Sequence, residues 1–198
     1  MRIISGSAGG LPIQVPRTVL RPTADRVREA VFSILGERVI DVDVLDLFAG
    51  SGSYGLECLS RGAASATFVD SERASAATIR ENLAKARLSG GTVAGAPVEA
   101  WIKSRLPTPA YDLIFADPPY AKARGDRDWN SLLLGDAHLP ELLREGGLFI
   151  LESFAKGGQT VPPGAPWQQQ DERRYGDSLL GFYQLLSHDA AAPGPAGL

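Results

Sequence analysis

The sequence contains little cysteine and histidine and no long apolar run. Cys58 is the single cysteine among 198 residues, and there are two histidines. One cysteine cannot form a disulfide within the chain, and these residues cannot supply the four ligands of a structural zinc site. The sequence has no run of about 18 apolar residues and no apolar signal-peptide core after Met1. We therefore expect a cytoplasmic monomer without a membrane span or a bound metal.

The charge is low overall and unevenly distributed. The net charge is −3, but residues 1–40 carry six arginines and three acidic residues, which leaves −6 for the remainder. A basic arm on an acidic body suits a polyanion held at one edge of the protein. Charge alone leaves open a second interpretation, in which the asymmetry belongs to an ordinary solvated surface.

From Val42 onward, apolar runs alternate with helical patterns, with glycine turns between them. The pattern predicts strands at residues 44–48, 66–69, 92–94, 113–116 and 148–152, and a closing pair of strands at 168–175 and 179–186. It predicts helices at 53–61, 72–86, 98–106 and 132–144, the last with a break at Pro140 and an end at Gly146-Gly147. Alternating strands and helices predict an α/β fold with a mostly parallel, doubly wound, seven-stranded sheet. The final two strands have no helix between them, which indicates an antiparallel edge strand.

The amino-terminal residues show a different pattern. Two short β-like runs, residues 2–4 and 12–15, flank a glycine-rich segment and predict a small hairpin. A helix follows, with Thr23 as its N-cap and Gly36 as its end. Its apolar stripe comprises Val27, Ala30, Val31, Ile34 and Leu35. We expect a hairpin extension at 1–20, a main domain at 21–187 and a disordered Ala/Pro/Gly-rich tail at 188–198.

A glycine-rich loop follows the first strand of the main domain. Gly50, Gly52 and Gly55 form a GxGxxG pattern, which allows close approach of a ligand to the backbone but is also used by NAD-binding oxidoreductases. Asp46 lies four residues before Gly50, near the end of the strand before the loop, and Asp70 ends the next strand, 20 residues after Gly50. A carboxylate at Asp46 suits a cationic amino-acid group and repels a pyrophosphate, while Asp70 can accept both hydroxyls of a ribose. S-adenosylmethionine has those groups and no phosphate.

A second motif, Asp117-Pro118-Pro119-Tyr120, ends the strand at 113–116. Neither proline has an N–H for a strand ladder, so the strand must end at the edge where open α/β sheets bind ligands. This tetrapeptide is similar to the motif of enzymes that methylate exocyclic amino groups. Asp117 and the Pro118 carbonyl can accept the two amino protons, and Tyr120 can stack a flipped base. The polar segment 122–128 before Trp129 is either a lid or an ordinary loop.

The combination of motifs resembles a known family, the bacterial methyltransferases that modify guanine N2 in 16S ribosomal RNA. The resemblance runs from Met1 to about Leu186 and rests on residues 20–32, 44–57, 59–63, 117–120 and 174–176. It implies a class I S-adenosylmethionine-dependent methyltransferase (Rossmann-like) fold, with ribosomal RNA or the small ribosomal subunit as partner. The sequence departs from the family where Gly95-Ala96 replaces the usual Gly-Asp and where the first hairpin is small and uncharged.

The resemblance and the motifs together assign roles to specific residues. The predicted catalytic residues are Asp117, Pro118, Pro119 and Tyr120. The predicted cofactor-binding residues are Asp46, Phe48, Gly50, Ser51, Gly52, Gly55, Asp70, Ser71, Ala96, Asp117, Thr23 and Arg26. The predicted RNA-binding residues are Arg17, Arg21, Arg28 and Arg174.

Other functions remain as alternatives. A DNA adenine-N6 methyltransferase uses the same tetrapeptide, but 198 residues leave no room for a separate DNA-recognition region. A protein-glutamine methyltransferase favours Asn where Asp117 stands. A non-catalytic RNA-binding assembly factor would have no use for intact Asp70 and Asp117, and an NAD-binding oxidoreductase would have no use for the tetrapeptide.

Overall fold

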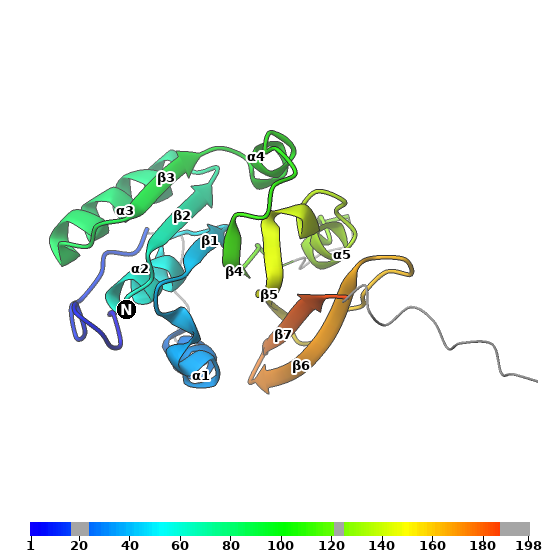
Figure 1. Ribbon diagram of the computed structural model, residues 1–198. Coiled ribbons are helices and arrows are strands. Elements are labelled where there is room, and N and C mark those ends of the chain that lie inside the picture. Colours follow the sequence, from blue (N-terminus) through cyan, green and yellow to red (C-terminus); the bar gives the residue numbers. More distant parts are fainter. Residues whose placement is uncertain (17–23, 121–124, 187–198) are drawn as a thin grey trace, which may run out of the picture.

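The computed structural model describes residues 1–16, 24–120 and 125–186 and is organised around a seven-stranded sheet (Figure 1). Its strands are β1 (Asp43–Leu47), β2 (Ser65–Asp70), β3 (Gly91–Gly95), β4 (Tyr111–Ala116), β5 (Leu143–Phe154), β6 (Trp167–Tyr175) and β7 (Ser178–Leu185). The spatial order is β3-β2-β1-β4-β5-β7-β6. β1 to β5 pair in parallel, whereas β7 is antiparallel to both β5 and β6. The predicted seven-stranded, mostly parallel sheet is confirmed. Its antiparallel strand is β7, which lies between β5 and the edge strand β6.

Helices cover both faces of the sheet (Figure 1). They are α1 (Ala24–Leu35), α2 (Ser53–Ser60), α3 (Arg73–Ala86), α4 (Val98–Lys103) and α5 (Trp129–Leu134), with short 3₁₀ helices η1 (Gly36–Val39) and η2 (Pro140–Leu142). One apolar core joins the sheet to α1, α2 and α3, and a second joins its other face to α4 and α5. Alternate β1 residues serve the two cores, Val44 the first and Leu45 the second, which is the arrangement of a doubly wound fold.

The predicted helix at 132–144 is wrong over most of its length. α5 ends at Leu134, the segment after it forms η2, and β5 begins at Leu143. Gly146 and Gly147, predicted to end the helix, lie inside β5, where the pairing with β4 shifts register. The apolar residues of this segment have good helix propensity, but pairing with β4 buries Leu143 and overrides it.

The predicted stripe of α1 is only partly correct. Val27, Val31 and Leu35 are buried, whereas Ile34 is 42% exposed. Ile34 lies at the margin of the helix face that packs on the sheet, where sequence periodicity cannot fix the limit of burial. The proposed N-cap, Thr23, and the tail 188–198 lie outside the described residues.

Residues 1–16 turn back on themselves and dock on α2. The predicted hairpin is reduced to one antiparallel bridge, Arg2 with Pro12. The fully buried Glu57 of α2 holds this segment, because its carboxylate accepts the backbone N–H of Ile4 (2.6 Å) and of Ser5 (3.0 Å). The Arg61 guanidinium lies 2.7 Å from the same carboxylate and balances its charge. Residues 1–16 are therefore an integral part of the first core.

Candidate active site

Four acidic side chains lie at the carboxyl ends of four neighbouring parallel strands. Asp46 is in β1, Asp70 ends β2, Asp117 follows β4 and Glu152 lies near the end of β5. The strand order places β2, β1, β4 and β5 side by side. In an open α/β sheet this edge is where ligands bind. The fold therefore brings together the two motifs identified in the sequence, which are about 60 residues apart.

The Asp70 carboxylate is fixed by the backbone on both sides. Its Oδ2 accepts the N–H of Gly50 (2.8 Å), and its Oδ1 accepts the N–H of Glu72 (2.8 Å). The backbone carbonyl of Asp70 accepts the N–H of Ala96 (3.0 Å), which joins β2 to the loop after β3. Each carboxylate oxygen keeps a lone pair, so the group can accept further hydroxyl donors. These acceptors fit the two hydroxyl groups of a ribose.

The three glycines of the loop do different things. A Cβ on Gly50 would meet nothing closer than the Phe48 carbonyl at 3.9 Å, so this turn is open to a ligand. A Cβ on Gly55 would lie 2.3 Å from the Phe68 ring, so Gly55 is required for packing of α2 on β2. Gly52 caps α2 with a left-handed backbone (φ 78°). Only Gly50 is therefore placed to let a cofactor approach the backbone closely.

Asp46 is buried beneath this loop, with 2% of its surface exposed. Its Oδ2 accepts the N–H of Gly55 at 3.0 Å, which fixes the first turn of α2. Burial raises the pKa of Asp46 to about 7, with a smaller contribution from the Asp70 charge, while the Gly55 N–H acts in the opposite direction. The carboxyl therefore changes charge near neutral pH, and a nearby cation would favour its ionised form.

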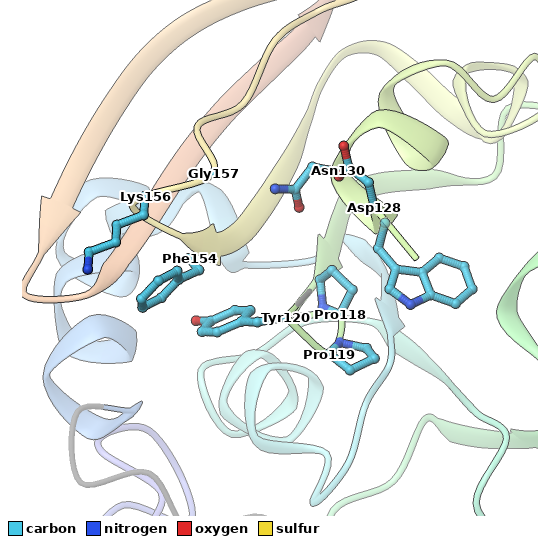
Figure 2. Close-up of a pocket in the computed structure, with 9 residues that line it drawn as sticks. Pro118, Pro119, Tyr120, Asp128, Asn130, Phe154, Lys156 and Gly157 are labelled. Atoms are coloured by element: carbon cyan, nitrogen blue, oxygen red, sulfur yellow. The ribbon is translucent and has the colours of Figure 1, made fainter. Parts of the chain in front are cut away.

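The Asp117–Tyr120 turn borders a pocket of about 390 Å³ (Figure 2). The lining residues are Pro118, Pro119, Tyr120, Asp128, Trp129, Asn130, Phe154, Lys156 and Gly157. The volume falls within the range of small-ligand pockets, which is roughly 300–1,000 Å³. The rings of Tyr120 and Phe154 lie side by side along one wall, with centroids 5.6 Å apart and planes at 37°. These aromatic faces can hold a planar ring.

Trp129 connects this pocket to the glycine loop. Its ring meets that of Phe48 edge to face, with centroids 4.9 Å apart. The Arg127 guanidinium lies over the indole ring, 4.6 Å from its centroid, and is held by a salt bridge to Glu99 (2.9 Å). Residues 122–124 of the segment considered as a lid lie outside the described residues, whereas Trp129 begins α5. Phe48, predicted to bind cofactor, thus lies between the loop and the pocket.

Glu152 is the centre of a buried polar cluster behind the tetrapeptide. Tyr54 donates to its Oε2 at 2.9 Å, and Ser178 donates to its Oε1 at 2.9 Å. Tyr120 Oη lies 3.4 Å from the same Oε1. Burial, then the charges of Glu152 and Asp117, raise the pKa of Tyr54, so Tyr54 remains a protonated donor. Glu152 was not among the residues predicted from the sequence, although it ends the strand predicted at 148–152 and Asp46, Asp70 and Asp117 likewise lie at or near strand ends.

Arg28 does not lie on the surface predicted for RNA binding. It is 1% exposed, and its Nη2 donates to the Arg2 carbonyl and to Asp25 (3.1 Å). Its charge lowers the pKa of Tyr54, opposing the carboxylates nearby. A guanidinium in this position cannot reach a phosphate outside the protein, so the expectation that Arg28 contacts RNA directly does not fit the structure.

The other predicted residues are variously placed. Arg26 and Ser71 are exposed, Ser51 is buried and Ala96 is half-buried. Arg174 is exposed on β6, and its Nε donates to the Gly176 carbonyl (3.1 Å). Arg17, Arg21 and Thr23 lie outside the described residues. Besides Glu152, the sequence analysis missed Tyr54, Asn130, Phe154 and Ser178, whose contacts join segments far apart in the chain and leave no local signal.

The described residues contain neither a cluster of metal ligands nor a membrane-spanning helix. Within 1–16, 24–120 and 125–186, no three His, Cys, Asp or Glu side chains gather as a metal site would require. In the same ranges, no helix has the length and apolar character needed to cross a membrane.

Comparison with known proteins gives consistent similarities over nearly the whole chain. A family model described as conserved hypothetical protein 95 matches residues 1–184. The ribosomal RNA small subunit methyltransferase D of Escherichia coli is 34% identical over 185 residues, 93% of this chain and 89% of that protein. A putative rRNA methyltransferase of Bacillus subtilis, YlbH, is 35% identical over 77% of this chain and 82% of its own length. The solved structure of a putative methyltransferase, yhhF of Escherichia coli, aligns with a TM-score of 0.78 and 34% identity, covering 93% of this chain and 97% of that one.

Proposed function

The chain belongs to the conserved hypothetical protein 95 family, and on that premise we propose that it methylates the exocyclic N2 amino group of a guanine in 16S ribosomal RNA. It is an enzyme, an S-adenosylmethionine-dependent rRNA methyltransferase. The observation that carries the choice of an amino group is the Asp117–Tyr120 turn, which borders a pocket of base-binding size. We further propose that the protein acts as a monomer in the cytoplasm, where its RNA substrate is made.

We propose that the cofactor lies along the carboxyl ends of β1 and β2. S-adenosylmethionine supplies a methyl group on a positively charged sulfur, which makes that carbon electrophilic. Asp70, with both oxygens anchored by backbone N–H groups, would accept the ribose hydroxyls. The open turn at Gly50 leaves room for close approach, and the Asp46 carboxylate below the loop favours a cationic group. Phe48, Ser51, Ser71 and Ala96 border the same loops and complete the proposed site.

Asp117 and Pro118 would orient the amino group. The lone pair of an exocyclic nitrogen is delocalised into the base, which makes it a weak nucleophile. Acceptors on both N–H groups, the Asp117 carboxylate and the Pro118 carbonyl, favour a pyramidal nitrogen whose lone pair points at the methyl carbon. The two prolines restrict the backbone, so the carbonyl is held in place before substrate binds. The nitrogen would gain the methyl group as the bond between that carbon and the sulfur breaks, which leaves S-adenosylhomocysteine. The nitrogen would release one proton to water, and no covalent enzyme intermediate would form.

The pocket would hold the flipped base. Tyr120 and Phe154 offer ring faces, and stacking of a base on an aromatic side chain contributes roughly 1–3 kcal/mol. Lys156 is exposed at the pocket margin, where an ammonium group can meet a phosphate. Arg174 on β6 is a second candidate for backbone contact, as are Arg17 and Arg21 from the sequence. The proposed RNA surface thus adds Lys156 and loses Arg28.

Replacing Asp117 by Ala tests the proposed chemistry. Labelled S-adenosylmethionine is incubated with 16S rRNA, small subunits, duplex DNA and total protein, and the labelled product is mapped. We expect N2-methylguanine in RNA with the wild type and at least about a hundredfold slower transfer with Asp117→Ala. Cofactor binding by calorimetry should be nearly unchanged. The control is Asp171→Ala, which also deletes one carboxylate, here from β6, where Asp171 pairs with Arg173. Near-normal transfer by Asp117→Ala, or labelled adenine in DNA, would overturn the proposal.

A further inference from the structure

Glu152 occupies an unusual position for a carboxylate. It is 6% exposed, at the carboxyl end of β5, and three hydroxyl groups surround it. They belong to Tyr54 of α2, Ser178 of β7 and Tyr120 of the tetrapeptide. Burying a charged carboxylate is costly unless it is hydrogen-bonded, and this one accepts from three separate segments of the chain. The cluster therefore ties the helix after the glycine loop and the sheet edge to the turn that borders the pocket.

Among the three hydroxyl donors, Tyr120 is the one whose ring lines the pocket. Its hydroxyl lies 3.4 Å from both Glu152 Oε1 and Ser178 Oγ, while its ring packs against Phe154. The ring is thus restrained at its far end by hydrogen bonds and along its face by an aromatic contact. The two prolines before Tyr120 have fixed φ angles, which restrict the chain that leads into it. These restraints fix the plane against which a base would stack.

We propose that Glu152 is a positioning residue, which holds Tyr120 through its hydroxyl so that the stacked guanine presents its amino group to Asp117 and Pro118. This inference rests on the proposed function. Glu152 acts through Tyr120 and Ser178, whose hydroxyl groups lie against the carboxylate oxygen on that side. A rigid platform keeps the reacting nitrogen in an attacking geometry more of the time, so loosening it slows the reaction without removing any group that touches the base.

The decisive variant is Tyr120→Phe, which keeps the ring and loses the anchor. We expect kcat/KM for 16S rRNA or small subunits, whichever the wild type methylates, to fall about tenfold, as for a lost hydrogen bond to a charged group. The Kd for S-adenosylhomocysteine should be unchanged. Glu152→Gln should give a similar loss, and the double variant Tyr120→Phe/Glu152→Gln should be little worse than either single variant, because both remove the same restraint.

Tyr183→Phe is the matched control. Tyr183 is fully buried and donates to Gln159 at 2.7 Å, beside the same end of β5 but away from the pocket. The Tyr183→Phe variant should lower the melting temperature at least as much as Tyr120→Phe does, while leaving kcat/KM unchanged. Wild-type kcat/KM in Tyr120→Phe, or additive losses in the double variant, would overturn the positioning role but not the proposed function. If Glu152→Gln does not fold, Ser178→Ala takes its place in the cycle. Absence of RNA methylation by the wild type would instead overturn the proposed function.

Discussion

The buried carboxyl group of Asp46 makes the stability of the folded protein depend on pH in an unusual direction. Its pKa is raised from 3.8 to about 7 in the folded state. The folded protein therefore binds this proton more tightly than the unfolded chain does. The resulting stabilisation is complete below the unfolded pKa and is lost as the pH rises through the folded pKa. A shift of this size corresponds to about 4 kcal/mol over the whole range.

The measurable part of this effect falls in an accessible pH range. Between about pH 5 and about pH 8, the Asp46 contribution to the free energy of unfolding should fall by about 2–3 kcal/mol. The perturbation is Asp46→Asn, which keeps an acceptor for the Gly55 N–H but has no proton to lose. The assay is urea unfolding of the cofactor-free protein at several pH values. The variant should gain stability relative to the wild type by that amount as the pH rises.

Subtracting the two pH profiles removes the contributions of titrating groups that do not interact with Asp46. Glu145→Gln, which removes one negative charge from an exposed position on β5, is the matched control for the loss of a carboxylate. Parallel profiles for wild type and Asp46→Asn would refute the reasoning, because they would mean that Asp46 titrates alike in the folded and unfolded states.

Two further predictions concern packing around α2. Gly55→Ala places a Cβ 2.3 Å from the buried Phe68 ring, so the free energy of unfolding should fall by about 1–3 kcal/mol, and an unchanged melting temperature would contradict the assigned packing role. Glu57→Ala removes the acceptor for the Ile4 and Ser5 N–H groups, so hydrogen exchange should accelerate about tenfold or more in residues 1–16. Equal acceleration in β1 would instead indicate global destabilisation.

The sequence was sufficient to predict the first half of the sheet because the signals there are local. The apolar runs at β1 and β4 are each followed by residues that end a strand, a glycine turn after β1 and two prolines after β4. The same local logic identified Asp46, Asp70 and Asp117, because each lies at or just after a strand end. The helix predicted at 132–144 failed where local propensity and tertiary pairing disagree, since Leu143 starts a strand that pairs with β4.

The polar cluster around Glu152 and the burial of Arg28 could not be predicted from local sequence patterns. Arg28 was interpreted as part of a basic arm, but the carbonyl that it contacts belongs to Arg2, 26 residues earlier. Ser178 and Tyr54 meet at Glu152 only because β7 pairs with β5 and α2 packs against the sheet. An acidic residue at the end of a predicted strand was the available signal for Glu152. Its partners could be identified only from the three-dimensional structure.

Because residues 1–16 dock on α2 and α3, the order in which segments are synthesised differs from the order in which they fold. Ile4 bonds to Glu57, 53 residues later, and Gln14 bonds to Asn82, 68 residues later. When these early residues leave the ribosome, neither helix that will receive them has yet been made. Contacts of such long sequence separation form late, after the loops between them have closed. The segment made before the rest of the described chain is thus expected to be among the last to reach its native place, where it completes a core whose other parts have already packed.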